Sequence, residues 1–275
     1  MLYKTVGWAN LDYMKQFVLA LIMLGLGLAA SAQTNAPVTP AALTNPAETA
    51  PVTPPEFVSP TTPDNARYLD NPSLLAGCEA QLAAINGKPC DIIFIGDSIT
   101  ANWLTVGKAI WDKYYAPRHA LDFGVGGDKT QNVLWRLTNM DVQSLKPKVA
   151  VLLIGTNNTA NNPHEIAAGV QAVLANTQEI FPGVKTILVS ILPNERANDK
   201  MMQVNSLIRG NVDNSTVYWL NLVPLMPAVT TTNPDGTVDT NWKGLGKDHL
   251  HPDASGYQIW ADAMEPLLTK LLAGQ

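Results

Sequence analysis

The sequence of 275 residues has only two cysteines and a small share of charged residues. Two cysteines cannot build a disulfide-rich scaffold or a zinc site with four thiolates. Charged residues make up 15% of the chain, against about 25% in typical proteins, and the formal net charge is −5. These values exclude a polybasic surface, so we expect no nucleic-acid partner.

The first 32 residues have the pattern of a secretory signal peptide. Lys15 precedes residues 17–32, of which 13 in 16 are apolar and none is charged, and small residues at Ala30 and Ala32 end the run. Cleavage is expected after Ala32. The alternative is an uncleaved membrane anchor, but the run is shorter than the ~20 residues that a bilayer span needs. We therefore expect a secreted or periplasmic protein without stable membrane insertion after cleavage, and a start at Met14 would make the signal more compact.

A proline-rich segment separates this signal from the rest of the chain. Eight of the 32 residues at positions 33–64 are proline, and threonine and alanine supply much of the remainder. Such a composition favours extended polyproline conformations and offers no apolar face to bury. We expect a disordered linker at residues 33–64, followed by one folded domain at residues 65–275.

The folded part alternates short apolar runs with stretches of helical pattern. The apolar runs are residues 91–95, 120–123, 149–154, 186–190 and 217–220, and the helical stretches are residues 104–115, 129–140, 164–181, 199–212 and 254–272. Continuous apolar strands between helices indicate a parallel sheet with both faces covered. We therefore predict an α/β fold, a three-layer α/β/α sandwich around a five-stranded parallel sheet. Ligands of such folds bind beyond the carboxyl ends of the strands.

The two cysteines, Cys78 and Cys90, lie 12 positions apart on either side of a helix that precedes the first strand. In an exported protein a disulfide across this spacing is expected, and it would contribute ~3 kcal/mol through loop entropy. The alternative is a pair of buried free thiols.

Two glycine-containing loops follow the first two predicted strands. Ser98, in the loop at residues 96–100, would sit at the edge of the sheet near a helix N-terminus, where a hydroxyl can act as a nucleophile or cap the helix. In the next loop, Gly124, Gly126 and Gly127 allow a tight turn with an N–H group directed at an anion. A dinucleotide-binding motif is disfavoured because Lys129 stands where a further glycine is required.

Two more polar loops also carry candidate site residues, one after the third strand and one before the last helix. Asn157 and Asn158 follow the third strand, where one can donate to an oxyanion and the other can stabilise the turn. Before the last helix, Asp248 stands three residues ahead of His251, close enough to hold its imidazole as a base. His249 and His251 could instead form a metal pair, but alternation would point the two rings apart and no third ligand is near.

In these four loops the sequence resembles the SGNH (GDSL-type) hydrolases over about residues 90–272. Residues 119–128 and 133–137 look most like the branch of the platelet-activating-factor acetylhydrolase catalytic subunits. The resemblance implies a flavodoxin-like sheet and assigns the nucleophile to Ser98. It also assigns oxyanion donors to Gly127 and Asn157, and the Asp-x-x-His pair to Asp248 and His251. It implies no metal and no organic cofactor, and because the branch includes dimers, a homodimer is one expectation for the assembly.

The expected reaction is hydrolysis of an ester through an acyl-serine intermediate, with the Ser98 N–H as a further oxyanion donor. The resemblance suggests a short acyl group, and export on a tether favours an acetylated carbohydrate as the substrate. A lipid esterase, an O-acetyltransferase that acts on sugar hydroxyls and an inactive binding module are the alternatives.

Aromatic residues could shape the substrate site. Trp103, Trp111, Trp219 and Trp242 are the candidates, of which Trp111 and Trp219 are expected in the core because of their helix and strand positions. Trp242 lies in a polar loop, residues 230–247, and is the best candidate for a sugar platform. His249 would add polarity near the site.

Overall fold

The computed structural model of the chain describes residues 59–274. The predicted signal peptide and most of the predicted linker lie outside these residues. Within residues 59–274, no helix combines the length and the hydropathy of a membrane span.

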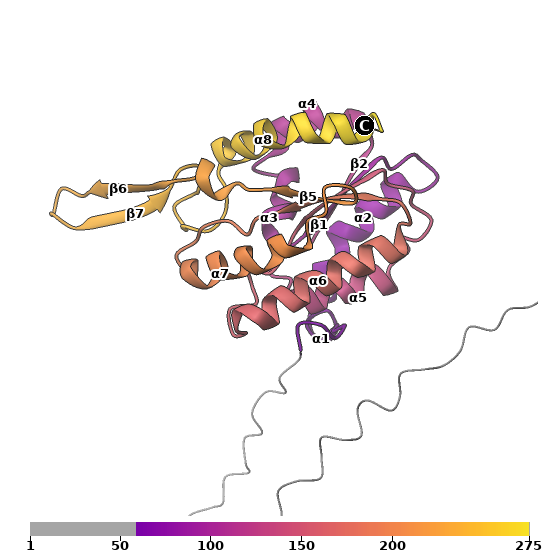
Figure 1. Cartoon of the computed structure of the whole chain (residues 1–275), viewed down its shortest axis with the longest axis horizontal. Helices are drawn as coiled ribbons and strands as arrows, with labels where there is room; N and C mark the ends of the chain where they lie inside the picture. The colour runs from indigo at the N-terminus through magenta and orange to yellow at the C-terminus, as the bar shows by residue number, and fades with distance from the viewer. Residues whose placement is uncertain (1–58, 275) are drawn as a thin grey trace, which may run out of the picture. The chain divides into compact units, whose positions relative to one another are not determined.

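The centre of the fold is a sheet of five parallel strands in the order β2-β1-β3-β4-β5 (Figure 1). The strands are β1 (Ile92–Gly96), β2 (Ala120–Gly124), β3 (Val149–Leu153), β4 (Lys185–Val189) and β5 (Val217–Leu220). Each strand begins and ends within one residue of the apolar run that predicted it. This strand order is that of flavodoxin-like folds, so the predicted fold class is confirmed.

Helices cover both faces of the sheet. One face carries α2 (Ala76–Ile85), α5 (Thr130–Asn139), α6 (Pro163–Ile180) and α7 (Asn198–Ile208), and the other carries α4 (Lys108–Tyr114) and α8 (Ala254–Leu272) (Figure 1). Alternate side chains of a strand point to opposite faces. Accordingly, Ile93 and Ile95 of β1 lie in the core beneath the first set, and Ile92 and Phe94 lie in the core beneath the second.

Local sequence explains where the long helices begin. Asn162 caps α6 by accepting the N–H of Glu165, whose side chain accepts the N–H of Asn162 in return, and Pro163 occupies the first turn. This reciprocal pair is a capping box, in which two otherwise unpaired backbone donors are satisfied. Asp253 caps α8 through a single bond, in which its carboxylate accepts the N–H of Gly256 at 3.0 Å. The cap of α8 matters for the site because it fixes the chain directly after His251.

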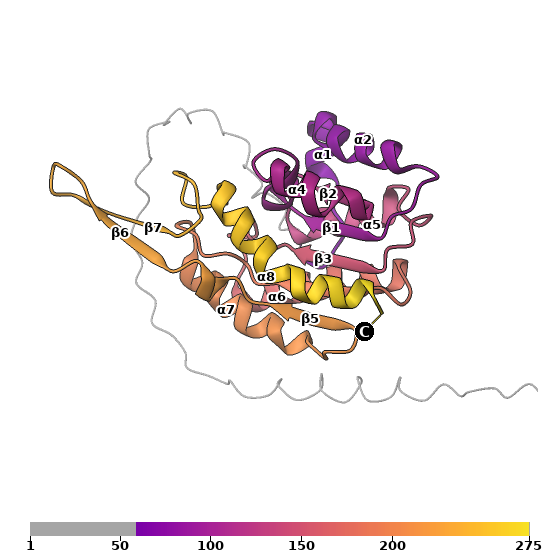
Figure 2. The same cartoon turned by 90° about the horizontal axis from the view of Figure 1, so that it is seen from above.

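The expected loop at residues 230–247 is largely a β-hairpin instead. Strands β6 (Ala228–Thr232) and β7 (Val238–Trp242) pair antiparallel, with a turn in which the Gly236 N–H donates to the Asn233 carbonyl at 2.9 Å. The hairpin extends away from the central sheet (Figure 2). Its strands have no buried residue and so no alternation of apolar and polar residues, which is why the sequence pattern did not reveal them.

The predicted disulfide is wrong, because Cys78 and Cys90 are free and buried. The Cys78 thiol donates to the Gly124 carbonyl at 3.6 Å, and the Cys90 thiol donates to the Ile92 carbonyl at 3.5 Å. Gly124 pairs with the last residue of β1 and Ile92 is its first, so the thiols lie at opposite ends of the strand. Four residues of strand span about 13 Å, which is too far for a disulfide.

Residues 59–64, which the composition assigned to the linker, pack on the domain. Pro60 is buried, and its carbonyl accepts the hydroxyl of Thr130 at 2.8 Å. The Asp64 N–H donates to the Gln131 carbonyl at 3.1 Å. The segment continues into α1 (Ala66–Asp70), which lies beside the start of α5 (Figure 1).

Candidate active site

Four loops meet at the carboxyl edge of the sheet. In the register of the parallel strands, Gly96 at the end of β1 pairs with Gly124 of β2 and with Leu153 of β3. The loops that leave these strands therefore emerge side by side. Close packing between them requires glycine at one point: a Cβ on Gly124 would lie 2.4 Å from the backbone nitrogen of Ala101.

The hydroxyl of Ser98 lies at this edge and contacts a histidine from the far end of the chain. Ser98 Oγ is 2.8 Å from Nε2 of His251. The helix α3 (Ser98–Ala101) is capped by Asp97, whose carboxylate accepts the N–H of Ile99 at 2.9 Å. The alternative that Ser98 only caps the helix therefore does not hold, and its hydroxyl is available to the imidazole.

Asp248 holds the other side of the same imidazole. Its Oδ2 lies 2.6 Å from Nδ1 of His251, and its Oδ1 accepts the backbone N–H groups of Leu250 and His251 at 3.2 and 3.0 Å. Burial tends to raise the pKa of Asp248, but these hydrogen bonds outweigh it and hold the pKa of the carboxyl below its ordinary value. The carboxylate is thus ionised at neutral pH beside a ring that can accept a proton.

Backbone donors lie next to the Ser98 hydroxyl. A Cβ on Gly126 would have the Ser98 Cβ as its nearest neighbour, at 3.9 Å, so the glycine loop runs beside the serine. Gly127 has a φ of +79°, a conformation that favours glycine. Within residues 59–274, the N–H groups of Ser98 and Gly127 have no hydrogen-bond acceptor, which leaves both free for a ligand.

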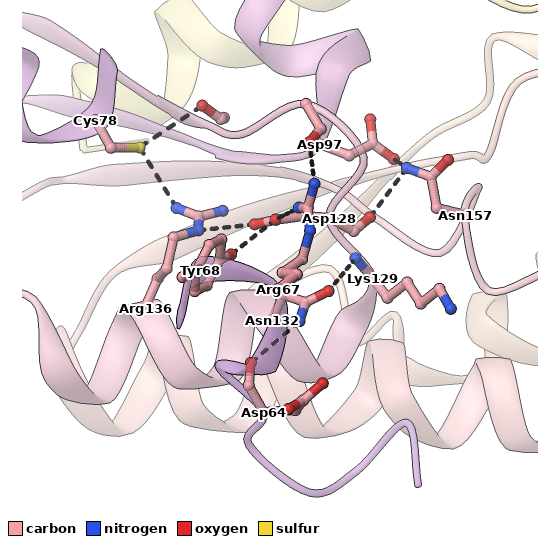
Figure 3. A network of polar contacts seen from close by, with 12 residues as sticks. Asp64, Arg67, Tyr68, Cys78, Asp97, Asp128, Lys129, Asn132, Arg136 and Asn157 are labelled. Carbon is pink, nitrogen blue, oxygen red and sulfur yellow. Dashed lines mark hydrogen bonds and ion pairs between the residues drawn. The ribbon is translucent and has the colours of Figure 1, made fainter. Parts of the chain in front are cut away.

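The two adjacent asparagines have different surroundings. Asn157 is half-buried, and its Nδ2 donates to the Asp128 carbonyl at 3.0 Å and lies 3.4 Å from the Asp97 carboxylate (Figure 3). Asn158 is fully buried, and its Oδ1 accepts the N–H of Thr130 at the start of α5. Asn158 thus joins the loop after β3 to the start of α5, and the assignment of an oxyanion donor to Asn157 stays a prediction.

Two buried carboxyls lie behind the loops. Burial raises the pKa of Asp97 to about 7 and the pKa of Asp122, in the middle of β2, to about 8. Asp122 Oδ1 accepts the N–H of Gly124 at 2.8 Å, and Oδ2 has no partner among the described residues. Asp122 is therefore protonated at neutral pH.

His249 lies near two carboxylates. Its Nδ1 lies 3.2 Å from Glu195 Oε2, and its Nε2 lies 3.6 Å from Asp239 Oδ2 in β7. His249 and His251 thus point to different surroundings. Within residues 59–274, no group of three or more His, Cys, Asp or Glu side chains is arranged to hold a metal ion.

The four tryptophans differ in burial, and each contacts one of the two cores. Trp103 and Trp111 are buried. The ring centroids of Trp103 and Tyr257 are 4.5 Å apart, and those of Trp111 and Phe94 are 5.1 Å apart. Trp219 and Trp242 are partly buried. Trp242 ends β7 and packs against the core beneath α8, so the hairpin is anchored at its base.

Sequence reasoning missed several residues that contact the site loops. Arg67 and Tyr68 of α1, with Arg136 of α5, surround the side chain of Asp128 (Figure 3). Arg196 donates to Oδ1 of Asn157 at 3.4 Å. No local pattern marks Arg67 or Arg196, because both reach the site through contacts between distant segments.

The GDSL-like Lipase/Acylhydrolase family matches residues 94–259. Platelet-activating factor acetylhydrolase IB subunit alpha1 of Homo sapiens is 32% identical over 191 residues, which cover 68% of this chain and 78% of that protein. Subunit alpha2 of Bos taurus is 33% identical over 187 residues, which cover 67% of this chain and 79% of that protein.

Solved structures share the fold at lower identity. A protein from Bacteroides fragilis NCTC 9343 matches with a TM-score of 0.57 at 18% identity, covering 76% of this chain and 99% of that one. A GDSL-like lipase from Bacteroides thetaiotaomicron VPI-5482 matches with a TM-score of 0.53 at 20% identity, covering 74% and 96%.

Proposed function

The chain belongs to the GDSL-like lipase/acylhydrolase (SGNH) family and is a carboxylic ester hydrolase, and we propose that Ser98, His251 and Asp248 carry out its reaction. The observation that supports this proposal is the unbroken series of contacts from Ser98 Oγ to His251 Nε2 at 2.8 Å and from His251 Nδ1 to Asp248 Oδ2 at 2.6 Å. A nucleophile, a base and a group that orients the base within hydrogen-bond reach are the parts that acyl transfer requires.

The proposed reaction has two halves. His251 Nε2 takes the proton of Ser98 as Oγ attacks the ester carbonyl, and Asp248 stabilises the imidazolium that forms. The tetrahedral intermediate collapses when the carbon–oxygen bond to the alcohol breaks, and His251 returns the proton to the departing alcohol. Water then attacks the acyl-serine with the same base, which releases the acid and restores the Ser98 hydroxyl.

Three groups are proposed to stabilise the oxyanion. Among residues 59–274 the N–H groups of Ser98 and Gly127 have no acceptor, and we assign the third donor to Nδ2 of Asn157, which contacts the Asp128 carbonyl at 3.0 Å and the Asp97 carboxylate at 3.4 Å when no substrate is bound. In related reactions, loss of one such donor raises the barrier by ~3–4 kcal/mol.

The test of this proposal is Ser98→Ala, assayed with p-nitrophenyl acetate. We expect kcat to fall by at least about a thousandfold and labelling by a fluorophosphonate probe to disappear. Ser206→Ala is the matched control, because the Ser206 hydroxyl is exposed on α7 and donates only to the Met202 carbonyl. Full activity of Ser98→Ala would contradict the assignment of the nucleophile.

For the substrate, we propose acetyl esters of carbohydrates outside the cytoplasm. The support is the name of the relatives as acetylhydrolases, together with the signal-like N-terminus and the proline-rich segment after it. A series of nitrophenyl esters of increasing chain length tests the acyl group, and acetylated xylan tests the alcohol. A clear preference for acyl chains of about eight carbons or more, each buried CH₂ contributing about 0.8 kcal/mol, would contradict the acetyl proposal.

A lipid-type ester is the second candidate. The relatives are named for platelet-activating factor, and Leu225, Val229 and Val238 are exposed apolar side chains on or beside the hairpin. Such side chains could contact an apolar substrate. Vesicles that contain an acetylated lysophospholipid, compared with acetylated xylan at equal ester concentration, separate the two candidates. Adding a sugar acceptor to either assay identifies acetyl transfer as an alternative to hydrolysis.

A further inference from the structure

A short N-terminal segment that precedes the family-matched residues packs against the glycine loop of the site. We call residues 59–70 the strap; they include α1 and end well before residue 94, where the family match begins. The strap follows the start of α5 through two hydrogen bonds, from the Thr130 hydroxyl to the Pro60 carbonyl and from Asn132 Nδ2 to the Asp64 carbonyl. These bonds bring α1 to the loop between β2 and α5.

Within the strap, Arg67 contacts the glycine loop on both sides of Gly127. One terminal nitrogen of its guanidinium donates to the Gly126 carbonyl at 2.7 Å, and the other pairs with the Asp128 carboxylate (Figure 3). A Cβ on Gly127 would lie 2.8 Å from the Arg67 guanidinium, so the planar group lies directly against this residue.

The contact to the Gly126 carbonyl has a geometric consequence. The Gly126 carbonyl and the Gly127 N–H belong to one planar trans peptide, in which the two groups point in opposite directions. A hydrogen bond that fixes the carbonyl toward Arg67 therefore fixes the N–H away from it. Between two glycines this peptide would otherwise rotate at little cost, because neither residue has a Cβ to restrict it.

The charges around Asp128 strengthen the arrangement. Asp128 Oδ2 accepts from Nε of Arg136 at 2.8 Å, and Oδ1 accepts from the hydroxyl of Tyr68 at 2.7 Å in addition to Arg67. Arg136 is fully buried and also donates to the carbonyls of Phe123 and Gly96. Two guanidinium groups, those of Arg67 and Arg136, pair with the one carboxylate of Asp128, so positive charge exceeds negative charge around that side chain. A fixed positive charge there favours a developing oxyanion.

We propose that Arg67 is a positioning residue for the ester hydrolysis, which orients the Gly126–Gly127 peptide so that the Gly127 N–H faces the oxyanion. This inference rests on the proposed function, in which Gly127 is an oxyanion donor. It gives the strap a part in the active site, beyond joining the domain to the preceding sequence.

The experiment compares Arg67→Ala with Arg118→Ala in the full chain, on p-nitrophenyl acetate. Arg118 is a matched control: its side chain is 26% exposed, as is that of Arg67, and it likewise pairs with a carboxylate, Glu265, and a backbone carbonyl, Tyr114. We expect Arg67→Ala to lower kcat by about 10- to 100-fold with little change in KM, because a misplaced donor acts on the transition state. Arg118→Ala should keep the kcat of the unmodified protein.

Chemical rescue separates positioning from a merely structural role. Guanidinium chloride at low millimolar concentration should restore part of the kcat of Arg67→Ala by occupying the vacated space beside Asp128 and the Gly126 carbonyl. It should not raise the kcat of Asn157→Ala, which lacks a different donor. Arg67→Lys keeps the charge but cannot reach both acceptors as a fork, so its kcat should remain about tenfold low.

The outcomes distinguish the inference from the proposed function. If Ser98→Ala is inactive while Arg67→Ala or Arg67→Lys keeps a normal kcat, the inference fails and the proposed function stands. An active Ser98→Ala overturns the proposed function itself. If Arg67→Ala does not fold, Arg67→Lys decides: a lowered kcat in a folded protein supports the inference, and a normal kcat overturns it.

Discussion

The carboxylate of Asp248 contacts His251 twice, through Oδ2 to the ring nitrogen Nδ1 at 2.6 Å and through Oδ1 to the backbone N–H at 3.0 Å. The backbone contact closes a tight turn, which determines which oxygen faces the ring. The two oxygens of the ionised Asp248 carboxylate can only accept hydrogen bonds, so Nδ1 of His251 must carry a proton. Nε2 then carries none and can accept the proton of Ser98.

The first prediction follows from this arrangement. In Asp248→Asn, the amide oxygen should keep the bonds to the backbone N–H groups, which turns the amide NH₂ toward Nδ1. His251 must then hold its proton on Nε2, and it cannot act as a base for Ser98. We expect kcat to fall by about 10³- to 10⁴-fold, with circular dichroism and thermal midpoint close to those of the unmodified protein.

Asp253→Asn is the control for this variant, since Asp253 also accepts a backbone N–H, at the start of α8, but contacts no ring of the site. Its activity should stay near that of the unmodified protein. A fully active Asp248→Asn would contradict the role proposed for the carboxylate.

The second prediction separates Asn157 from Asn158. Asn157→Ala should lower kcat by about a hundredfold or more and leave stability nearly unchanged, because it removes a proposed oxyanion donor. Asn158→Ala should lower stability and leave kcat nearly unchanged. It leaves the buried N–H of Thr130 without an acceptor, at a cost of about 1–3 kcal/mol in the free energy of unfolding. Paired kinetic and urea-denaturation measurements check both. Similar losses of kcat in the two variants, at equal stability, would contradict the division of roles.

Much of the fold was predictable because its strands are buried on both faces. The runs that became β1 and β3 are continuously apolar, and the helical stretches at residues 164–181 and 254–272 became α6 and α8. The position of the candidate site was also predictable, because parallel strands bring their carboxyl ends to one edge of the sheet. The contact between Asp248 and His251 was predictable because the two residues lie within one turn of the chain.

The remainder depends on contacts that no local pattern reveals. Arg67 is 61 residues from Asp128 in sequence, and nothing in the composition of residues 59–70 indicates that they pack beside Gly127. The free thiols were mispredicted for the same reason, because the spacing of Cys78 and Cys90 says nothing about the length of β1 between their side chains. Strands β6 and β7 lack a buried face, so hydrophobic periodicity could not identify them.

The third prediction concerns these thiols. Burial raises the pKa of Cys78 to about 11 and that of Cys90 to about 12, and the thiolate is the form that reacts with disulfide reagents. The folded protein, purified without reductant, should therefore react slowly with Ellman's reagent, and two thiols should titrate after unfolding in urea. A reductant should not change the thermal midpoint. Detection of no thiol in the unfolded, unreduced protein would mean that a disulfide forms.

The fourth prediction concerns Asp122, whose carboxyl has a pKa of about 8 in the folded protein. In the unfolded chain it titrates near its ordinary value of about 4. Between these two values the folded state keeps a proton that the unfolded state has released, so rising pH favours unfolding, by at most about 1.4 kcal/mol per pH unit, and the effect levels off above pH 8. Asp122→Asn cannot ionise and can still accept the Gly124 N–H. The unfolding free energy of the unmodified protein should thus fall relative to that of Asp122→Asn as the pH rises from 5 to 8.

The control for this pH series is Asp213→Asn. Asp213 is exposed, and three backbone N–H groups, those of Ser215, Thr216 and Val217, hold the pKa of its carboxyl well below the ordinary value. The contribution of Asp213 to the free energy of unfolding is therefore complete by pH 5 and is lost only on acidification. The difference in unfolding free energy between this variant and the unmodified protein should be constant from pH 5 to pH 9.

Asp97, with a pKa raised to about 7, makes the unfolding free energy of all three proteins fall with rising pH in the same direction as Asp122 does. For this reason differences between proteins are compared and not single curves. A constant difference for Asp122→Asn as well would show that Asp122 is already ionised in the folded state.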